Sequence, residues 1–299
     1  PKTVGRIGLC HMLSKNGGVR SEFTIHKRSQ NNYYLVFAGA QERHDWDYLK
    51  KLAPSDGSVI MQKLTTQIGV LVLAGPKSRE VLQKLTDTDL GNDNFKWLSG
   101  KRIDIGYAQA EALRVNFIGE LGWELHHPIE MQNYIFDALM AAGAEHQVRP
   151  FGIRAMESMR LEKSYRLIPR ELSIEYSALE SGLDRFIKLD KEQDFIGKQA
   201  LISWQRRGFK YRFVTLEVHG TKDADARGSE GLYEKSRLVG RATSGGYGFR
   251  TSKSLALGLV EAELAVIGTD LEIEILGERY PATVIEESPY DPDNERLRA

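Results

Sequence analysis

The first forty residues contain runs of apolar or β-favouring positions of the kind that form β-strands. Apolar or β-favouring runs cover residues 6–13 and 19–26, and the turn between them, residues 15–18, reads Lys-Asn-Gly-Gly. Asn-Gly followed by a second glycine is a strong turn signal, because glycine tolerates positive φ. The pattern predicts a β-hairpin, followed by a third strand over residues 33–38.

The middle of the chain mixes helical and strand periods. Four segments repeat their apolar positions at helical spacing, and they lie at residues 41–52, 78–85, 131–143 and 152–163. A continuous apolar run at residues 70–74 predicts a short buried strand. Leu113, Val115 and Phe117 alternate with polar residues and predict a half-buried strand.

After about residue 205 the pattern changes to short β-like runs divided by glycine-rich turns. These runs lie at residues 213–218, 238–243, 255–260, 271–276 and 280–286. Such spacing is typical of a small antiparallel barrel or sandwich. We therefore expect an α+β fold with two domains, a two-lobed body over residues 1–205 and an antiparallel β-barrel over residues 206–299.

Composition and charge narrow the class of protein. The chain has 299 residues, of which 41% are hydrophobic and 27% charged, and this is typical of a globular protein. Its 41 basic residues balance 41 acidic ones, which argues against a general nucleic-acid surface. Cys10 is the single cysteine, so no disulfide forms within the chain. No apolar run approaches the ~18 residues of a membrane span. We expect a cytoplasmic protein, or a mitochondrial matrix protein in a eukaryote, without nucleic-acid or membrane partners.

Several familiar chemistries are not indicated. The sequence has no G-x-G-x-x-G or P-loop motif for a dinucleotide or triphosphate, no G-x-S-x-G elbow and no zinc-site spacing. Cys10 and His11 are adjacent on a predicted strand and point to opposite faces, as do His126 and His127. We therefore expect no metal site, and structural or surface roles for these histidines.

Two carboxylates are candidates for chemistry. Glu22 lies on the second strand of the predicted hairpin, where its simplest interpretation is an exposed strand residue. Glu124 lies between Trp123 and Leu125, after a glycine-rich turn that enters a strand. A half-buried carboxylate there needs a donor. An arginine or an amidine-like ring edge would be a suitable bidentate donor, and an internal salt bridge is the alternative.

Two further segments have competing interpretations. Arg160 and Lys163 share one face of a predicted helix at i, i+3, and a solvated helix face is the simplest explanation. Residues 243–249 read Thr-Ser-Gly-Gly-Tyr-Gly-Phe. Such a run lets the backbone approach a ligand closely, but it also suits a bulged turn in a barrel.

The motifs follow one another in a specific order. The most specific are Gly-Glu-Leu-Gly-Trp-Glu-Leu at residues 119–125 and Asp-Phe-Ile-Gly-Lys at residues 194–198. In this order the sequence resembles the aminomethyltransferase (glycine-cleavage T-protein) family along almost its whole length. It resembles above all the folate-binding C-terminal half of dimethylglycine and sarcosine dehydrogenases. The resemblance implies further sequence before Pro1, and a flavin-bearing dehydrogenase domain or subunit as partner.

The resemblance also implies site residues. The family's folate domain binds tetrahydrofolate in a central channel between three lobes. Glu124 matches the glutamate that grips the pterin amino and ring N–H groups. Arg160 matches an arginine that contacts the folate glutamate tail or supports the channel, and Tyr247 matches a ligand-side aromatic residue. Glu22 falls where the family usually has its functional aspartate, which makes it the candidate catalytic residue.

Two more folate-binding positions follow from the same resemblance. Phe117 stands where a tyrosine is common before x-Gly-Glu, so a hydroxyl contact is lost. Trp123 precedes the pterin-gripping glutamate directly, and we expect it beside the folate.

The implied reaction is the capture of a one-carbon unit, from an iminium derived from an N-methyl amine or from an aminomethyl donor, as 5,10-methylenetetrahydrofolate. One alternative is a folate-dependent S- or O-demethylase that yields 5-methyltetrahydrofolate. Another is a folate-binding regulatory or RNA-modification accessory protein without transfer activity. The basic aromatic stretch at residues 204–212 would support the last, but it is also explained as a solvated interdomain linker or as a docking site for folate polyglutamate.

Overall fold

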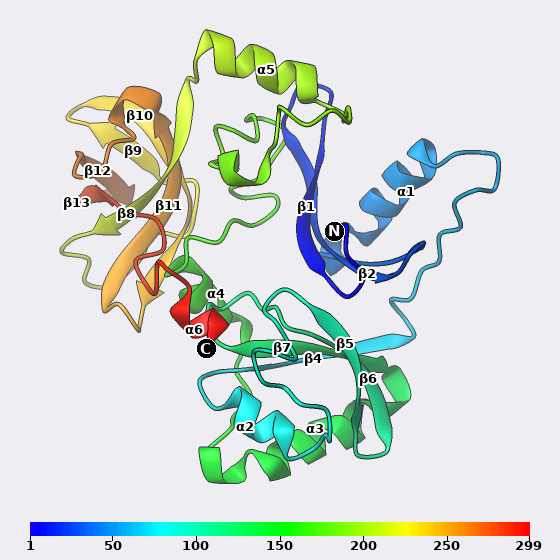
Figure 1. Ribbon diagram of the computed structural model, residues 1–299. Coiled ribbons are helices and arrows are strands. Elements are labelled where there is room, and N and C mark those ends of the chain that lie inside the picture. The colour runs from blue at the N-terminus through cyan, green and yellow to red at the C-terminus, as the bar shows by residue number, and fades with distance from the viewer. The chain divides into compact units, whose positions relative to one another are not determined.

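The computed structural model describes residues 1–299, which form two compact units. Unit 1 consists of Pro1–Leu9, Phe23–Phe151 and Asp293–Ala299, and unit 2 of Cys10–Glu22 and Gly152–Pro292. The units are therefore interleaved along the chain. Both units contain helices and strands, and one sheet of unit 2 closes into an antiparallel barrel (Figure 1). The predicted α+β fold with a C-terminal antiparallel barrel is confirmed.

The chain opens with the predicted hairpin. Strands β1 (Ile7–Leu13), β2 (Val19–Ser29) and β3 (Asn32–Phe37) form a sheet in that order. The backbone N–H of Ser14 donates to the carbonyl of Gly18 at 2.8 Å, and Gly17 has a φ of +84°. The glycine is needed at that position because a side chain would be strained at this angle.

Unit 1 is built on a second sheet and three helices, of which one lies before, one between and one after the strands of that sheet in the chain. The strand order is β4 (Ile68–Ala74), β7 (Gly122–Pro128), β6 (Ala108–Leu113) and β5 (Gly100–Ile105). The longer helices are α1 (Glu42–Leu52), α2 (Ser78–Gln83) and α3 (Gln132–Ala142), and α6 (Glu295–Arg298) is a single turn. One face of this sheet packs on α2 and α3 and forms the core of the unit.

The two faces of this sheet differ because side chains alternate along each strand. Leu73, Ala110, Ala112, Trp123 and Leu125 lie in the core with α2 and α3. The positions between them point to the opposite side, which we call the second face; its members are Val70, Val72, Glu111, Leu113, Glu124 and His126. Part of the second face is covered by Tyr34 of β3, and Val70 and Val72 are exposed.

The strand predicted over residues 113–117 is wrong. Strand β6 ends at Leu113, and the chain then leaves the sheet until β7 begins at Gly122. The side chain of Asn116 explains the departure, because it accepts from the backbone N–H of Ile118 at 3.0 Å and donates to the carbonyl of Glu120 at 2.7 Å. A local turn of this kind competes with the sheet ladder for the same backbone.

Unit 2 contains the barrel and two helices, α4 (Ile153–Leu161) and α5 (Lys198–Arg207). The barrel strands are β8 (Tyr211–Val218), β9 (Gly231–Glu234), β10 (Arg237–Gly248), β11 (Lys253–Glu261), β12 (Asp270–Ile275) and β13 (Glu278–Ile285). They close in the order β10-β11-β8-β13-β12-β9. Inward-facing residues such as Leu216, Leu232, Ala256 and Ile273 fill the barrel as its own core.

The basic aromatic stretch is not a linker. Residues up to Arg207 belong to α5, and β8 begins at Tyr211, so only three residues connect them. Trp204 donates its indole N–H to the carbonyl of Asn16 at 3.2 Å, and the Arg207 guanidinium lies 3.5 Å from the Trp204 ring centre. The linker interpretation is therefore wrong, because α5 and β8 together contain all but three residues of the stretch.

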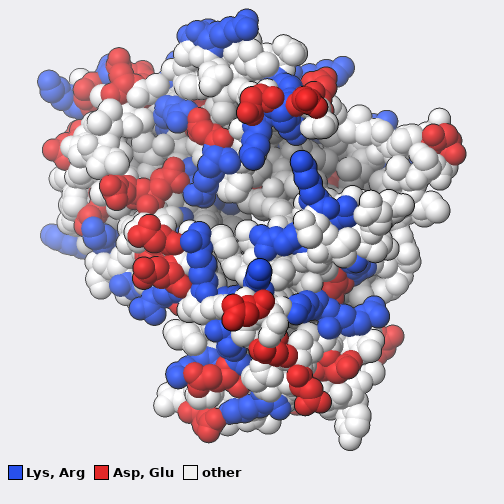
Figure 2. Space-filling view, viewed as in Figure 1, with Lys and Arg blue, Asp and Glu red and all other residues white.

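The formal charges of the chain balance, with 41 basic and 41 acidic residues. On the face that Figure 2 shows, Lys and Arg side chains are interspersed with Asp and Glu. None of the helices combines the length and the apolar character that crossing a membrane requires.

Candidate functional site

The six predicted site residues are divided between the units. Glu124, Phe117 and Trp123 belong to unit 1, and the other three, Glu22, Arg160 and Tyr247, belong to unit 2.

Glu124 lies on the open part of the second face of the unit 1 sheet. Its strand β7 pairs with β4, where Val72 is its direct partner and Val70 the partner of His126. Both valines are more than 40% exposed, and the Glu124 side chain is 22% exposed. A partly exposed carboxylate thus lies beside an exposed apolar surface formed by two valines.

His126 and Tyr34 connect Glu124 to the interior of unit 1. The imidazole Nε2 of His126 lies 3.2 Å from Oε2 of Glu124, and its Nδ1 lies 3.0 Å from the Tyr34 hydroxyl. The His126 side chain is 1% exposed and Tyr34 is 9% exposed. Burial raises the pKa of the Tyr34 phenol to about 12. This contact was not predicted from the sequence, although His126 stands two residues after Glu124 and must share its strand face.

A second cluster of charges backs Tyr34. Glu111 accepts hydrogen bonds from Arg28 and from His26, the latter at 2.5 Å. Although burial alone would raise it, these bonds lower the pKa of Glu111 to about 2. The Arg28 guanidinium lies 3.9 Å from the centre of the Tyr34 ring. The guanidinium stacked on the face of the Tyr34 ring restricts the position of the phenol.

The other unit 1 candidates lie in different environments. Trp123 is fully buried, on the core face of β7, with its ring edge-on to Phe95 at 6.0 Å. Phe117 is half-buried in the irregular segment between β6 and β7. Neither residue shares the strand face of Glu124, because Trp123 precedes Glu124 by one position and Phe117 is outside the sheet.

Glu22 is not the exposed strand residue of the simplest interpretation. Its Oε2 lies 2.8 Å from Nε2 of His11 on the neighbouring strand β1, and its side chain is 21% exposed. The His11 side chain is 6% exposed and packs its ring against Phe186 at 5.5 Å. Both candidate carboxylates therefore contact a buried histidine.

Arg160 is completely buried, so the solvated-face interpretation of its helix is wrong. Its guanidinium donates to Glu157 at 2.9 Å, to Ser244 at 2.7 Å and to the carbonyl of Tyr165 at 2.9 Å, and lies 3.4 Å from Glu171. Glu171 is itself fully buried. The guanidinium is thus surrounded by acceptors from its own unit on every side.

Glu162 and Lys163, which follow α4 directly, are buried in the same way as Arg160. Glu162 accepts from the guanidinium Nε of Arg250 at 2.5 Å and from the backbone N–H groups of Arg250 and Thr251. Lys163 donates to the carbonyls of Tyr290 and Asp291. This charged run holds the helix to the barrel and the segment after it within unit 2.

The glycine-rich stretch lies in barrel strand β10, which carries a bulge between Ala242 and Ser244. A side chain at Gly246 would meet Leu161 at 3.3 Å, and one at Gly248 would meet Glu162 at 2.8 Å. The close approach that these glycines permit is therefore that of helix α4. Tyr247, between them, is 41% exposed, and its ring lies 5.1 Å from that of Phe249.

Within unit 2 the structure brings Arg160 and Tyr247 to the same helix–strand contact. Ser158 of α4 donates to the carbonyl of Tyr247 at 2.7 Å, and Arg160 donates to Ser244 of the same strand. No contact joins Glu22 to either residue.

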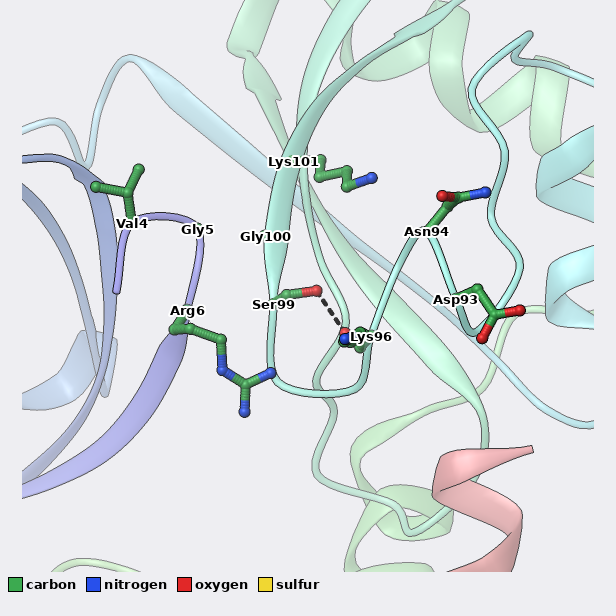
Figure 3. Close-up of a pocket in the computed structure, with 9 residues that line it drawn as sticks. All are labelled: Val4, Gly5, Arg6, Asp93, Asn94, Lys96, Ser99, Gly100 and Lys101. Atoms are coloured by element: carbon green, nitrogen blue, oxygen red, sulfur yellow. Dashed lines mark hydrogen bonds between the residues drawn. The ribbon is translucent and has the colours of Figure 1, made fainter. Parts of the chain in front are cut away.

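A hollow of about 250 Å³ lies elsewhere in unit 1 (Figure 3). It is lined by Val4, Gly5, Arg6, Asp93, Asn94, Lys96, Ser99, Gly100 and Lys101. Three of these residues are cationic and one is acidic, and none is a predicted site residue. Glu124 does not line this hollow, so the hollow has no part in the site of Glu124.

Comparison with known proteins identifies the chain's relatives. The GCVT N-terminal domain matches residues 1–191, and the glycine cleavage T-protein C-terminal barrel domain matches residues 212–291. Mitochondrial dimethylglycine dehydrogenase of Homo sapiens is 40% identical over 99% of this chain and 34% of its own length. The chain thus spans about a third of that relative.

Two further relatives are matched over most of their length. An aminomethyltransferase of Geobacillus thermodenitrificans is 31% identical over 94% of this chain and 76% of its own. The crystal structure of a glycine cleavage system aminomethyltransferase T from Bartonella henselae superposes with a TM-score of 0.84, at 21% identity, over 97% of this chain and 77% of that one. The first match shows family and the second shows fold, and the resemblance seen in the sequence is confirmed: the chain belongs to the glycine cleavage T-protein family.

Proposed function

We propose that this chain binds tetrahydrofolate and transfers a one-carbon unit onto it from an iminium or aminomethyl donor, giving 5,10-methylenetetrahydrofolate. The observation that carries the proposal is Glu124, a half-exposed carboxylate beside exposed Val70 and Val72. When bound, the folate supplies the nucleophilic nitrogens that receive the carbon. Membership of a family whose named relatives include aminomethyltransferases supports the same reaction.

The second face offers a pterin ring a carboxylate acceptor and an exposed apolar surface. A pterin presents an amino group and a ring N–H side by side, and a carboxylate accepts such a pair with two parallel hydrogen bonds. Only one oxygen of Glu124 is engaged within the protein, by His126. The two valines offer the apolar surface that the flat ring would cover, as in most small-molecule sites.

Roles follow for the remaining candidates. Glu22 is proposed to accept or orient a proton at the reacting edge of the folate, because a carboxylate oxygen can act as a proton or hydrogen-bond acceptor. Arg160 is proposed to support the site, since its guanidinium is already surrounded by acceptors. Trp123 would act through β7, since it has no exposed surface. Phe117 and Tyr247 are proposed as aromatic contacts to the ligand, each partly exposed.

Replacing Glu124 by glutamine is the direct test of folate binding. We expect Glu124→Gln to weaken tetrahydrofolate binding by about 1.5–3 kcal/mol, the value of hydrogen bonds to a charged group. That loss corresponds to about a 10- to 150-fold higher Kd. Anaerobic titration with tetrahydrofolate measures it.

Glu130→Gln is the matched control, because Glu130 is exposed just after the same strand and carries the same charge. Its affinity should equal that of the wild type. Equal affinities for both variants would remove Glu124 from the site.

We also predict that residues 1–299 bind no flavin or nicotinamide, because no dinucleotide fingerprint occurs in the sequence. The purified chain should be colourless, without the yellow absorption of a bound flavin. A stoichiometric yellow flavin would overturn the proposed division into a folate-binding body, residues 1–205, and a barrel domain, residues 206–299. A flavin-bearing partner or domain is proposed to supply the iminium.

Product analysis separates the proposed reaction from the alternative demethylase. The proposed reaction yields 5,10-methylenetetrahydrofolate, and demethylation of an S- or O-methyl donor yields 5-methyltetrahydrofolate. Retained folate with no transfer from any donor would instead indicate a non-catalytic folate-binding protein.

A further inference from the structure

Tyr34, His126 and Glu124 form a chain of two hydrogen bonds that runs from the interior of unit 1 to the second face. We propose that Tyr34 and His126 are positioning residues, which fix Glu124 in one orientation and leave Oε1 and the second lone pair of Oε2 to accept a ligand's two N–H donors. The proposal rests on the proposed function, because it concerns how the same carboxylate is prepared for the pterin.

The two distances determine which atoms carry the protons of these two hydrogen bonds. If His126 carried its proton on Nδ1 alone, the lone pair of Nε2 would face the Glu124 carboxylate at 3.2 Å, which is repulsive. If both nitrogens were protonated, the buried Tyr34 hydroxyl would accept from Nδ1, and its own proton would have no acceptor. Only the neutral ring with its proton on Nε2 satisfies every group.

In that arrangement each group donates toward the surface. The Tyr34 hydroxyl donates to Nδ1 of His126, and the Nε2–H of His126 donates to Oε2 of Glu124. The raised pKa of Tyr34 keeps its phenol protonated, as a donor, at neutral pH. The Glu124 carboxylate only accepts, so it requires the proton on Nε2, and the phenol completes the arrangement by donating to Nδ1.

The interior end of the chain is anchored. Arg28 stacks on the Tyr34 ring at 3.9 Å and is itself bound by Glu111. Glu111 also binds His26, whose side chain is 5% exposed. Tyr34 thus has a fixed position. Its hydroxyl orients the imidazole of His126, and the imidazole orients the carboxylate of Glu124. A carboxylate that is already oriented loses less freedom when a ligand binds.

The tautomer of His126 is the first test. Selective ¹⁵N labelling of histidine in the 299-residue chain, without folate, reports which ring nitrogen carries the proton, and comparison with His126→Gln assigns the signal. We expect the Nε2–H tautomer at neutral pH. An Nδ1–H tautomer or a doubly protonated ring would overturn the proposal.

The second test removes only the first donor. Tyr34→Phe should raise the Kd for tetrahydrofolate by about 3- to 10-fold, the value of one neutral hydrogen bond. Tyr33→Phe is the matched control, because Tyr33 is the adjacent residue of β3 and is 45% exposed. In a Glu124→Gln background, Tyr34→Phe should have no further effect, since the oriented carboxylate is already gone.

The outcomes distinguish this proposal from the proposed function. Loss of affinity in Glu124→Gln together with wild-type affinity in Tyr34→Phe would leave the folate site in place and refute the positioning role. If Glu124→Gln itself binds folate normally, the proposed function at this face is wrong and the role of Tyr34 and His126 in it is wrong with it.

Discussion

Glu22→Gln should bind tetrahydrofolate nearly as well as the wild type and transfer the one-carbon unit about 10²- to 10⁴-fold more slowly, the usual contribution of a positioned acid or base. Glutamine keeps the size of the side chain and still reaches His11, which lies 2.8 Å away. It removes the charge that accepts or orients the proton. Single-turnover formation of methylenetetrahydrofolate by enzyme-bound folate measures the effect.

Two further variants make the result specific. Glu22→Asp should retain part of the activity, because the charge survives and only the reach toward His11 is lost. Glu192→Gln changes an exposed glutamate of the same unit and should be as fast as the wild type. A Glu22→Gln variant as fast as the wild type would leave catalysis to the positioning of folate alone.

Arg160→Ala should destabilise the protein by about 3–5 kcal/mol, because it leaves the buried carboxylate of Glu171 without its cation. It also removes the donor to Ser244 and to the carbonyl of Tyr165. Urea unfolding gives the change in free energy of unfolding.

Arg170→Ala is the matched control. Arg170 lies 3.7 Å from Glu157, a carboxylate that Arg160 also binds, but its side chain is 46% exposed. A surface pair of this kind contributes about 0.2–1 kcal/mol. Equal costs for the two variants would contradict a structural role for Arg160. A large loss of folate affinity in Arg160→Ala that remains folded would assign Arg160 to the ligand instead of to its support.

Much of the fold follows from local patterns. The helix predicted over residues 131–143 is α3, Gln132–Ala142, and the β-like runs after residue 205 are strands of the barrel. Apolar periodicity predicts these elements because each buries one face in its own unit. Residues 113–117 show the limit, since alternation continues past Leu113 while the side chain of Asn116 turns the backbone away.

The site shows a different limit. Charged residues of α4 have the spacing of a solvated face, and nothing in the local pattern indicates that Glu171, Ser244 and Arg250 will surround them. The contact of His11 with Glu22 crosses a predicted hairpin, and that of His126 with Glu124 joins two positions of one strand face. Strand geometry alone therefore makes both histidines candidates, whereas the assignment of their partners required the fold.

The interleaving of the units has a consequence for synthesis on the ribosome. Val19 donates to the carbonyl of Ser173 at 2.8 Å, and Ala178 donates to that of Gly17, although all of residues 23–151 lie between these partners in the chain. At about 5–20 residues per second, residues 10–22 wait on the order of ten seconds before their partners leave the ribosome. An isolated two-stranded hairpin is marginally stable in water. The nascent chain therefore exposes residues 10–22 while residues 23–151 are synthesised, and chaperones have their main opportunity to bind the segment during that interval.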